Sequence, residues 1–146
     1  MNPSDKEQFS ALVLDHYEDP YHCGPLEQCT HSSTGSIPVC GDTICAELRI
    51  SQESTIEEAW FQGDGCLLSQ AAASILMEQA EGMSLEEFRN FSANDMLKLV
   101  GTPLLINRQK CCLLPWRVMQ EAVASAIDHD IDEDPHFGGP SLREES

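Results

Sequence analysis

The sequence predicts an α+β domain in which helices pack on a small antiparallel sheet. Strand-like alternation of apolar and polar residues occupies residues 43–62. Helical periodicity occupies a segment before this stretch and most of the chain from residue 66 to residue 131. A chain of 146 residues suggests one domain, long enough to bury a core without disulfide bonds.

The first helix is expected over residues 4–20. Its stripe recurs at the helical period and consists of Phe9, Leu12, Val13 and His16–Tyr17. Ser4 and Glu7 have the spacing of a capping box, and Pro20 ends the helix. Residues 20–39 are rich in Pro, Gly, Ser, Thr and Cys, which predicts a loop.

Two strands are expected after the loop. In residues 43–51, "TICAELRIS", the alternating apolar positions are Ile44, Ala46, Leu48 and Ile50. A second strand is centred on Ala59–Gln62 and is followed by Gly63 and Gly65.

The helical part begins at Cys66. Residues 66–82 are rich in strong helix formers, and Gly82 is a natural C-cap. Residues 84–91 predict a short helix that starts with a capping box, and residues 92–101 predict another that ends at Gly101.

The last long helix is expected over residues 111–131, after a connector at 102–110. Pro115 is expected in its first turn, where a proline is tolerated. The stripe predicted to face the core consists of Trp116, Met119, Val123 and Ile127. We therefore divide the chain into a domain, 1–128, and an acidic, flexible tail, 129–146.

The formal net charge of −17 disfavours nucleic acid as a partner and favours basic proteins and cations. Neither a transmembrane segment nor a signal peptide is recognisable, so we expect a cytoplasmic protein that does not bind membranes. In that compartment the seven cysteines should be mostly reduced, which favours metal ligands or reactive thiols.

Three cysteines lie at expected element boundaries. Cys40 precedes the first strand, and Cys66 and Cys111 lie at helix starts, where the helix dipole lowers a thiol pKa. With the carboxylate of Asp42 they would make a four-coordinate site for Zn²⁺ or iron. The spacing is not a local ligand motif, and buried free cysteines are common. Cys45 is a candidate for such a buried cysteine without a metal, whereas the roles of Cys23, Cys29 and Cys112 stay open.

Four stretches share a further pattern: "LDHYEDPYHCG", "PVCGD", "FQGDGCLLSQAAASIL" and "KCCLLPWRVMQEAV". In this order they resemble the U-type iron–sulfur scaffold family, which includes IscU, SufU and the N-terminal part of NifU. The resemblance implies an α+β fold with a three-stranded antiparallel sheet. It also implies that Cys40, Asp42, Cys66 and Cys111 meet at one exposed end, with Cys111 as the persulfide acceptor.

The resemblance also implies a function. Such proteins take persulfide sulfur from a cysteine desulfurase, and most build a transient [2Fe–2S] cluster that passes to apo-proteins. The SufU branch instead binds Zn²⁺ and relays sulfur. Lys110 resembles that branch, because IscU proteins have histidine there, but the insertion typical of SufU before the third cysteine is missing. A structural zinc domain is the third alternative.

Overall fold

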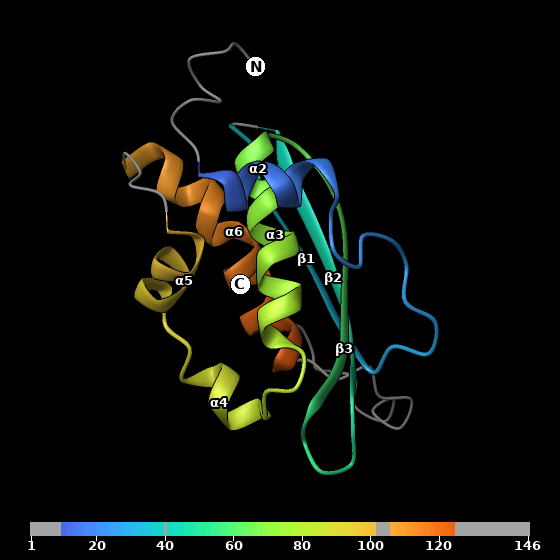
Figure 1. The fold of residues 1–146 in the computed structure, drawn as a ribbon. Coiled ribbons are helices and arrows are strands. Elements are labelled where there is room, and N and C mark those ends of the chain that lie inside the picture. Colours follow the sequence, from blue (N-terminus) through green and yellow to red (C-terminus); the bar gives the residue numbers. More distant parts are fainter. Residues whose placement is uncertain (1–9, 40, 102–105, 125–146) are drawn as a thin grey trace.

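The computed structural model describes residues 10–39, 41–101 and 106–124 (Figure 1). The elements, in chain order, are α2 (Ala11–Glu18), β1 (His31–Ile37), β2 (Asp42–Ile50), β3 (Ile56–Asp64), α3 (Leu67–Ala80), α4 (Leu85–Arg89), α5 (Ala93–Val100) and α6 (Ile106–Val123). The three strands form one antiparallel sheet in the order β1-β2-β3. The α+β class and the three-stranded sheet are therefore confirmed.

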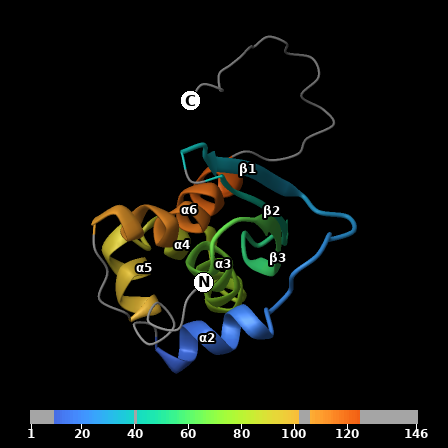
Figure 2. The same ribbon diagram turned by 90° about the horizontal axis from the view of Figure 1, so that it is seen from above.

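The sheet has one face covered by helices. Helix α6 packs on β1 and β2, and α3 packs on β3 and β2. Helix α2 contacts α3, and α5 contacts both α3 and α6, so these two helices form an outer layer (Figure 2). The predicted alternation of β2 is confirmed, because Ile44, Ala46 and Leu48 are all fully buried in the core. The start of β2, the start of α3 and the N-terminal half of α6 thus come close to one another.

Strand β1 lies in a segment that the composition predicted to be a loop, and that prediction is wrong. Its sequence, HSSTGSI, has little of the apolar alternation that marks a half-buried strand. The strand forms because all seven residues pair with β2 and because α6 covers its inner face. The expectation that the first strand begins after Cys40 is therefore wrong, because β1 already spans His31–Ile37.

Helix α6 starts earlier than expected. Residues 106–110 belong to it, so Cys111 is not at the helix start and Pro115 is not in the first turn. A proline inside a helix cannot donate the hydrogen bond that normally runs to the carbonyl four residues earlier, here that of Cys111. Of the predicted stripe, Met119 and Val123 are buried and Trp116 is partly buried; Ile127 lies outside the described residues.

Helix α2 also differs from expectation. It starts at Ala11, because Ser10 is the N-cap and its Oγ accepts a hydrogen bond from the Val13 N–H at 3.2 Å. Val13 is buried, but Leu12 and Tyr17 are 43% and 44% exposed, so the expected stripe is only partly core. The cap predicted at Ser4 lies outside the described residues.

The three middle helices follow the capping signals. Cys66 is the N-cap of α3, and Gly82 follows its C-cap with a φ of 94°. Capping boxes begin α4 and α5, and Gly101 closes α5 in the left-handed conformation. Within the part of the chain that the structure describes, no helix has both the length and the apolar character that a bilayer crossing requires. The predicted tail, 129–146, and the boundary at 128 lie outside that part.

We expect Gly35→Ala to loosen the packing of α6 on the sheet. A Cβ at this position would lie 2.8 Å from Cγ2 of Val118, so the variant should lose about 1–3 kcal/mol of unfolding free energy. Urea unfolding measures this loss. If the clash is the cause, Gly35→Ala combined with Val118→Ala should lose less than the sum of the two single changes. Additive losses would contradict this explanation.

Candidate metal centre

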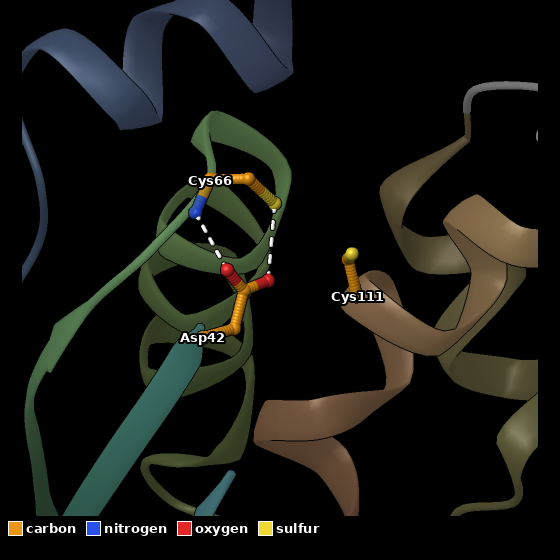
Figure 3. A group of neighbouring side chains, drawn as sticks. All are labelled: Asp42, Cys66 and Cys111. Atoms are coloured by element: carbon orange, nitrogen blue, oxygen red, sulfur yellow. Dashed lines mark hydrogen bonds between the residues drawn. The ribbon is translucent and has the colours of Figure 1, made fainter. Parts of the chain in front are cut away.

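Three of the four predicted ligands come together at one end of the sheet. One donor atom from each of Asp42, Cys66 and Cys111 lies within 4.8 Å of the other two. Asp42 is the first residue of β2, Cys66 caps α3, and Cys111 faces them from α6 (Figure 3). Cys40, the fourth predicted ligand, lies outside the described residues. We refer to Asp42, Cys66 and Cys111 as the donor cluster.

Asp42 is held by two hydrogen bonds from Cys66. Its Oδ1 accepts the backbone N–H of Cys66 at 2.9 Å, and its Oδ2 accepts the Cys66 thiol at 3.2 Å. The aspartate is only 1% exposed, because it occupies the same face of β2 as the core residues. A buried carboxylate is costly unless it is hydrogen bonded, so these contacts fix the start of β2 against the start of α3.

Gly65 makes this contact possible. Its φ is 144°, and a Cβ built on it would lie 2.3 Å from Oδ1 of Asp42. Only a residue without a side chain leaves room for the carboxylate at that distance. The expectation that glycine lets the backbone approach the centre therefore holds for Gly65. Gly63 approaches the β2 backbone instead, since its Cβ would lie 2.4 Å from the Thr43 carbonyl oxygen.

Cys66 is oriented by the first turn of α3. Its sulfur accepts a hydrogen bond from the Ser69 N–H at 3.4 Å, and the Ser69 hydroxyl donates to the Cys66 carbonyl at 3.2 Å. Ser69 is fully buried beneath the cluster. Ser69 stands in one of the four stretches that carry the family resemblance but was given no role of its own, although a hydroxyl three residues after a predicted helix start is a signal that could have identified it.

The thiol pKa of Cys111 shifts in the direction opposite to the prediction. The residue is 5% exposed, and burial is the main reason that the pKa of its thiol is raised; the nearby Cys66 and Asp42 raise it further. The expected lowering by a helix N-terminus is wrong, because Cys111 lies inside α6. A metal ion would have to displace the proton of this thiol, so metal binding here should release protons.

The remaining described cysteines are outside the donor cluster. Cys112 is fully buried in the core, and burial raises the pKa of its thiol to about 12. Cys23 is exposed, and Cys29 and Cys45 are partly buried. Cys45 alternates with the core residues of β2 and lies on the face of the sheet away from α3 and α6. Of the adjacent pair, it is therefore Cys111 that faces Asp42 and Cys66.

The donor set fits a thiophilic cation. Two sulfurs and one carboxylate oxygen are a ligand combination that suits Zn²⁺ or iron. Zn–S bonds of 2.3 Å in tetrahedral geometry separate two sulfurs by about 3.8 Å, so the cluster has to contract only slightly around such an ion. Lys110 is exposed on α6, and its ammonium group has no lone pair for a metal.

Comparisons with known proteins identify relatives for most of the chain. Residues 8–129 match the family model described as the NifU-like N terminal domain. The chain is 35% identical to the iron–sulfur cluster assembly scaffold protein IscU of Haemophilus influenzae, over 80% of this chain and 93% of that protein. It is 26% identical to the zinc-dependent sulfurtransferase SufU of Bacillus subtilis, over 80% of this chain and 89% of that protein.

A solved structure has the same fold. The N-terminal part of a NifU-like protein from Brucella abortus superposes with a TM-score of 0.68 and 18% identity, covering 82% of this chain and 94% of that one. At this identity the likeness concerns the fold alone.

We expect Gly65→Ala to weaken metal binding at the donor cluster. The new Cβ has to displace the Asp42 carboxylate, and the φ of 144° adds backbone strain. The matched control is Gly82→Ala, which has a positive φ of 94° but no heavy atom within 4 Å of its Cβ. Zn²⁺ affinity, measured by chelator competition, should fall at least tenfold more in Gly65→Ala. Equal affinities in the two variants would contradict the steric argument.

Proposed function

Because the chain belongs to the NifU-like N-terminal domain family, we propose that it is an iron–sulfur cluster assembly scaffold. In this proposal it accepts persulfide sulfur from a cysteine desulfurase, binds iron and builds a transient [2Fe–2S] cluster for apo-proteins. The observation that carries the proposal is the donor cluster, in which three elements far apart in sequence bring two thiols and a carboxylate within 4.8 Å.

Cys111 is the proposed sulfur acceptor. Because the pKa of the Cys111 thiol is raised, this thiol first has to give its proton to a base. The resulting thiolate attacks the terminal sulfur of the desulfurase persulfide, a new S–S bond forms on Cys111, and the desulfurase cysteine leaves as a thiolate that takes up a proton from solvent. Cys111 is 5% exposed, so the donor has to reach a largely buried sulfur. The turn between β1 and β2 directly precedes Asp42 in the sequence. That turn carries Val39, which is 95% exposed and offers an apolar contact for a partner.

Iron is cargo in this scheme. Thiolate sulfur from Cys66 and Cys111 suits iron, whereas the Asp42 carboxylate is a harder and weaker ligand for a cluster. Each sulfane sulfur needs two electrons to become a bridging sulfide, and an external thiol reductant can supply them. Cys40, which stands two residues before Asp42, is the proposed fourth ligand.

A zinc-dependent sulfurtransferase is the second candidate. It is favoured by Lys110, which is exposed beside Cys111 and leaves that position without a histidine ligand. In this alternative Zn²⁺ at the donor cluster would supply Lewis acidity that keeps the cysteine sulfurs anionic, and the chain would relay sulfur without building a cluster. The desulfurase partner and the cytoplasmic location predicted above are common to both candidates, whereas transfer of a cluster to apo-proteins belongs to the scaffold alone.

Anaerobic reconstitution distinguishes the candidates. The chain is incubated with a cysteine desulfurase, cysteine, ferrous iron and dithiothreitol, and is followed by visible absorption and metal analysis. The scaffold should acquire visible charge-transfer bands and equal iron and sulfide, and Cys66→Ser and Cys111→Ser should lose both. Cys45→Ser, which lies outside the donor cluster, is the control. Persulfide on the chain with bound zinc and no cluster would favour the sulfurtransferase.

We expect Asp42→Ala to slow cluster release. The weakest iron ligand is the first to exchange, so its removal should trap the cluster on the remaining sulfurs. The rate of cluster transfer to apo-ferredoxin, followed by absorbance, should fall about tenfold. This corresponds to a rise of about 1.4 kcal/mol in the activation free energy of release. Asp64→Ala is the control, because it removes the same charge from an exposed site at the same end of the sheet. Equal or faster release from Asp42→Ala would contradict a role in lability.

A further inference from the structure

A second feature lies beside the donor cluster, on the outer side of α6. A pocket of about 440 Å³ opens between the end of β1 and α6. Its apolar walls are Ile37, Pro38, Leu113 and Trp116, and its two cationic residues are Lys110 and Arg117. On α6, Lys110, Leu113 and Arg117 are three and four residues apart, so they share one face of the helix. We call this feature the α6 pocket.

The α6 pocket is held open by contacts of its own walls. Trp116 donates its indole N–H to the Phe91 carbonyl at 2.8 Å, which fixes the ring at the pocket edge. Arg117 donates to the Ser36 carbonyl at 3.3 Å, so its guanidinium group stays beside the end of β1. The pocket therefore combines apolar walls with two cationic residues, which suits a segment that carries both carboxylates and an apolar side chain.

The positive charge of the pocket is unusual for this chain. Lysine and arginine together number 8, against 25 aspartates and glutamates. Two of those 8 cations line one pocket, whereas Arg49, on the sheet, is paired with Glu57 and Glu58. An acidic occupant is thus favoured at this place, while most of the remaining surface repels one.

We propose that the α6 pocket binds the acidic segment of residues 128–137 of the same chain. This segment, DHDIDEDPHF, has carboxylates on both sides of Ile131 and ends in Phe137. The inference goes beyond the proposed function, because it needs neither iron nor sulfur at the donor cluster. Lys110 precedes Cys111, and Ile37 pairs with Asp42, so an occupied pocket would place the segment at the edge of that cluster.

The tether is long enough. Lys110 lies about 20 Å along α6 from Val123, at 1.5 Å per residue. An extended chain spans up to about 3.3 Å per residue, so residues 124–131 can cover the distance back to the pocket. A short tether also gives an effective concentration of about millimolar, which a free peptide or a second copy of the chain at micromolar concentration cannot match.

Zero-length cross-linking of the full wild-type chain tests the proposal. A carbodiimide joins lysine amines to carboxylates in contact, and mass spectrometry identifies the linked peptides. Lys110 should link to Asp128, Asp130, Asp132 or Glu133 far more than Lys98 does. Lys98 is the matched control, because it is exposed and lies on α5, which packs against α6. The link should fade at 1 M salt, where the Debye length falls to about 3 Å. Equal linking of Lys110 and Lys98 would overturn the proposal.

A mixture of ¹⁴N- and ¹⁵N-labelled chains at about 10 µM separates the possible occupants. Links within one chain should exceed mixed links about a hundredfold, given the tether; predominantly mixed links would mean that a second copy fills the pocket and would overturn the proposal. Arg117→Ser should reduce the Lys110 link at least threefold, whereas Arg89→Ser, an exposed change on α4, should not. Unchanged linking in Arg117→Ser would also count against the pocket.

Discussion

The arrangement of the domain depends on one buried carboxylate. Asp42 accepts the backbone N–H and the thiol of Cys66, and these two contacts join the start of β2 to the start of α3. A carboxylate that is 1% exposed would be expensive without them. Gly65 supplies the space for the contact, and α6 packs on β1 and β2 closely enough to bring Cys111 to the same point. The donor cluster therefore results from the starts of β2 and α3 meeting the side of α6 that carries Cys111.

The helices and strands that the sequence predicts are those with signals between residues close together in the chain. The capping residues of α3, α4 and α5, and the alternation in β2, describe interactions within a few residues, so the sequence alone located these elements. Strand β1 has no such signal, because its polar residues become a strand only through pairing with β2 and contact with α6. The predicted start of α6 was wrong because it relied on Pro115. By local rules a proline fits the first turn of a helix, but here it lies inside the helix.

The same distinction applies to the candidate site. Motif resemblance selected Asp42, Cys66 and Cys111, and the structure brings them together. The electrostatic expectation for Cys111 failed, because it rested on the wrong helix start and ignored burial, which raises the pKa of that thiol. The α6 pocket was missed for a different reason: two cations around a tryptophan acquire meaning only when their partners are known. Ser69, in contrast, had a local signal in its spacing from the start of α3.

Asp42 also explains how the proposed scaffold could release what it binds. Cys66 satisfies the Asp42 carboxylate through two hydrogen bonds, so an ion that leaves the site leaves behind a hydrogen-bonded group and not a bare buried charge. The raised pKa of Cys111 acts in the same direction, because a proton competes with the metal for that sulfur. Both effects lower net affinity without removing any ligand. A site built for permanent structural zinc gains nothing from this competition, whereas a scaffold that has to transfer its cargo depends on it.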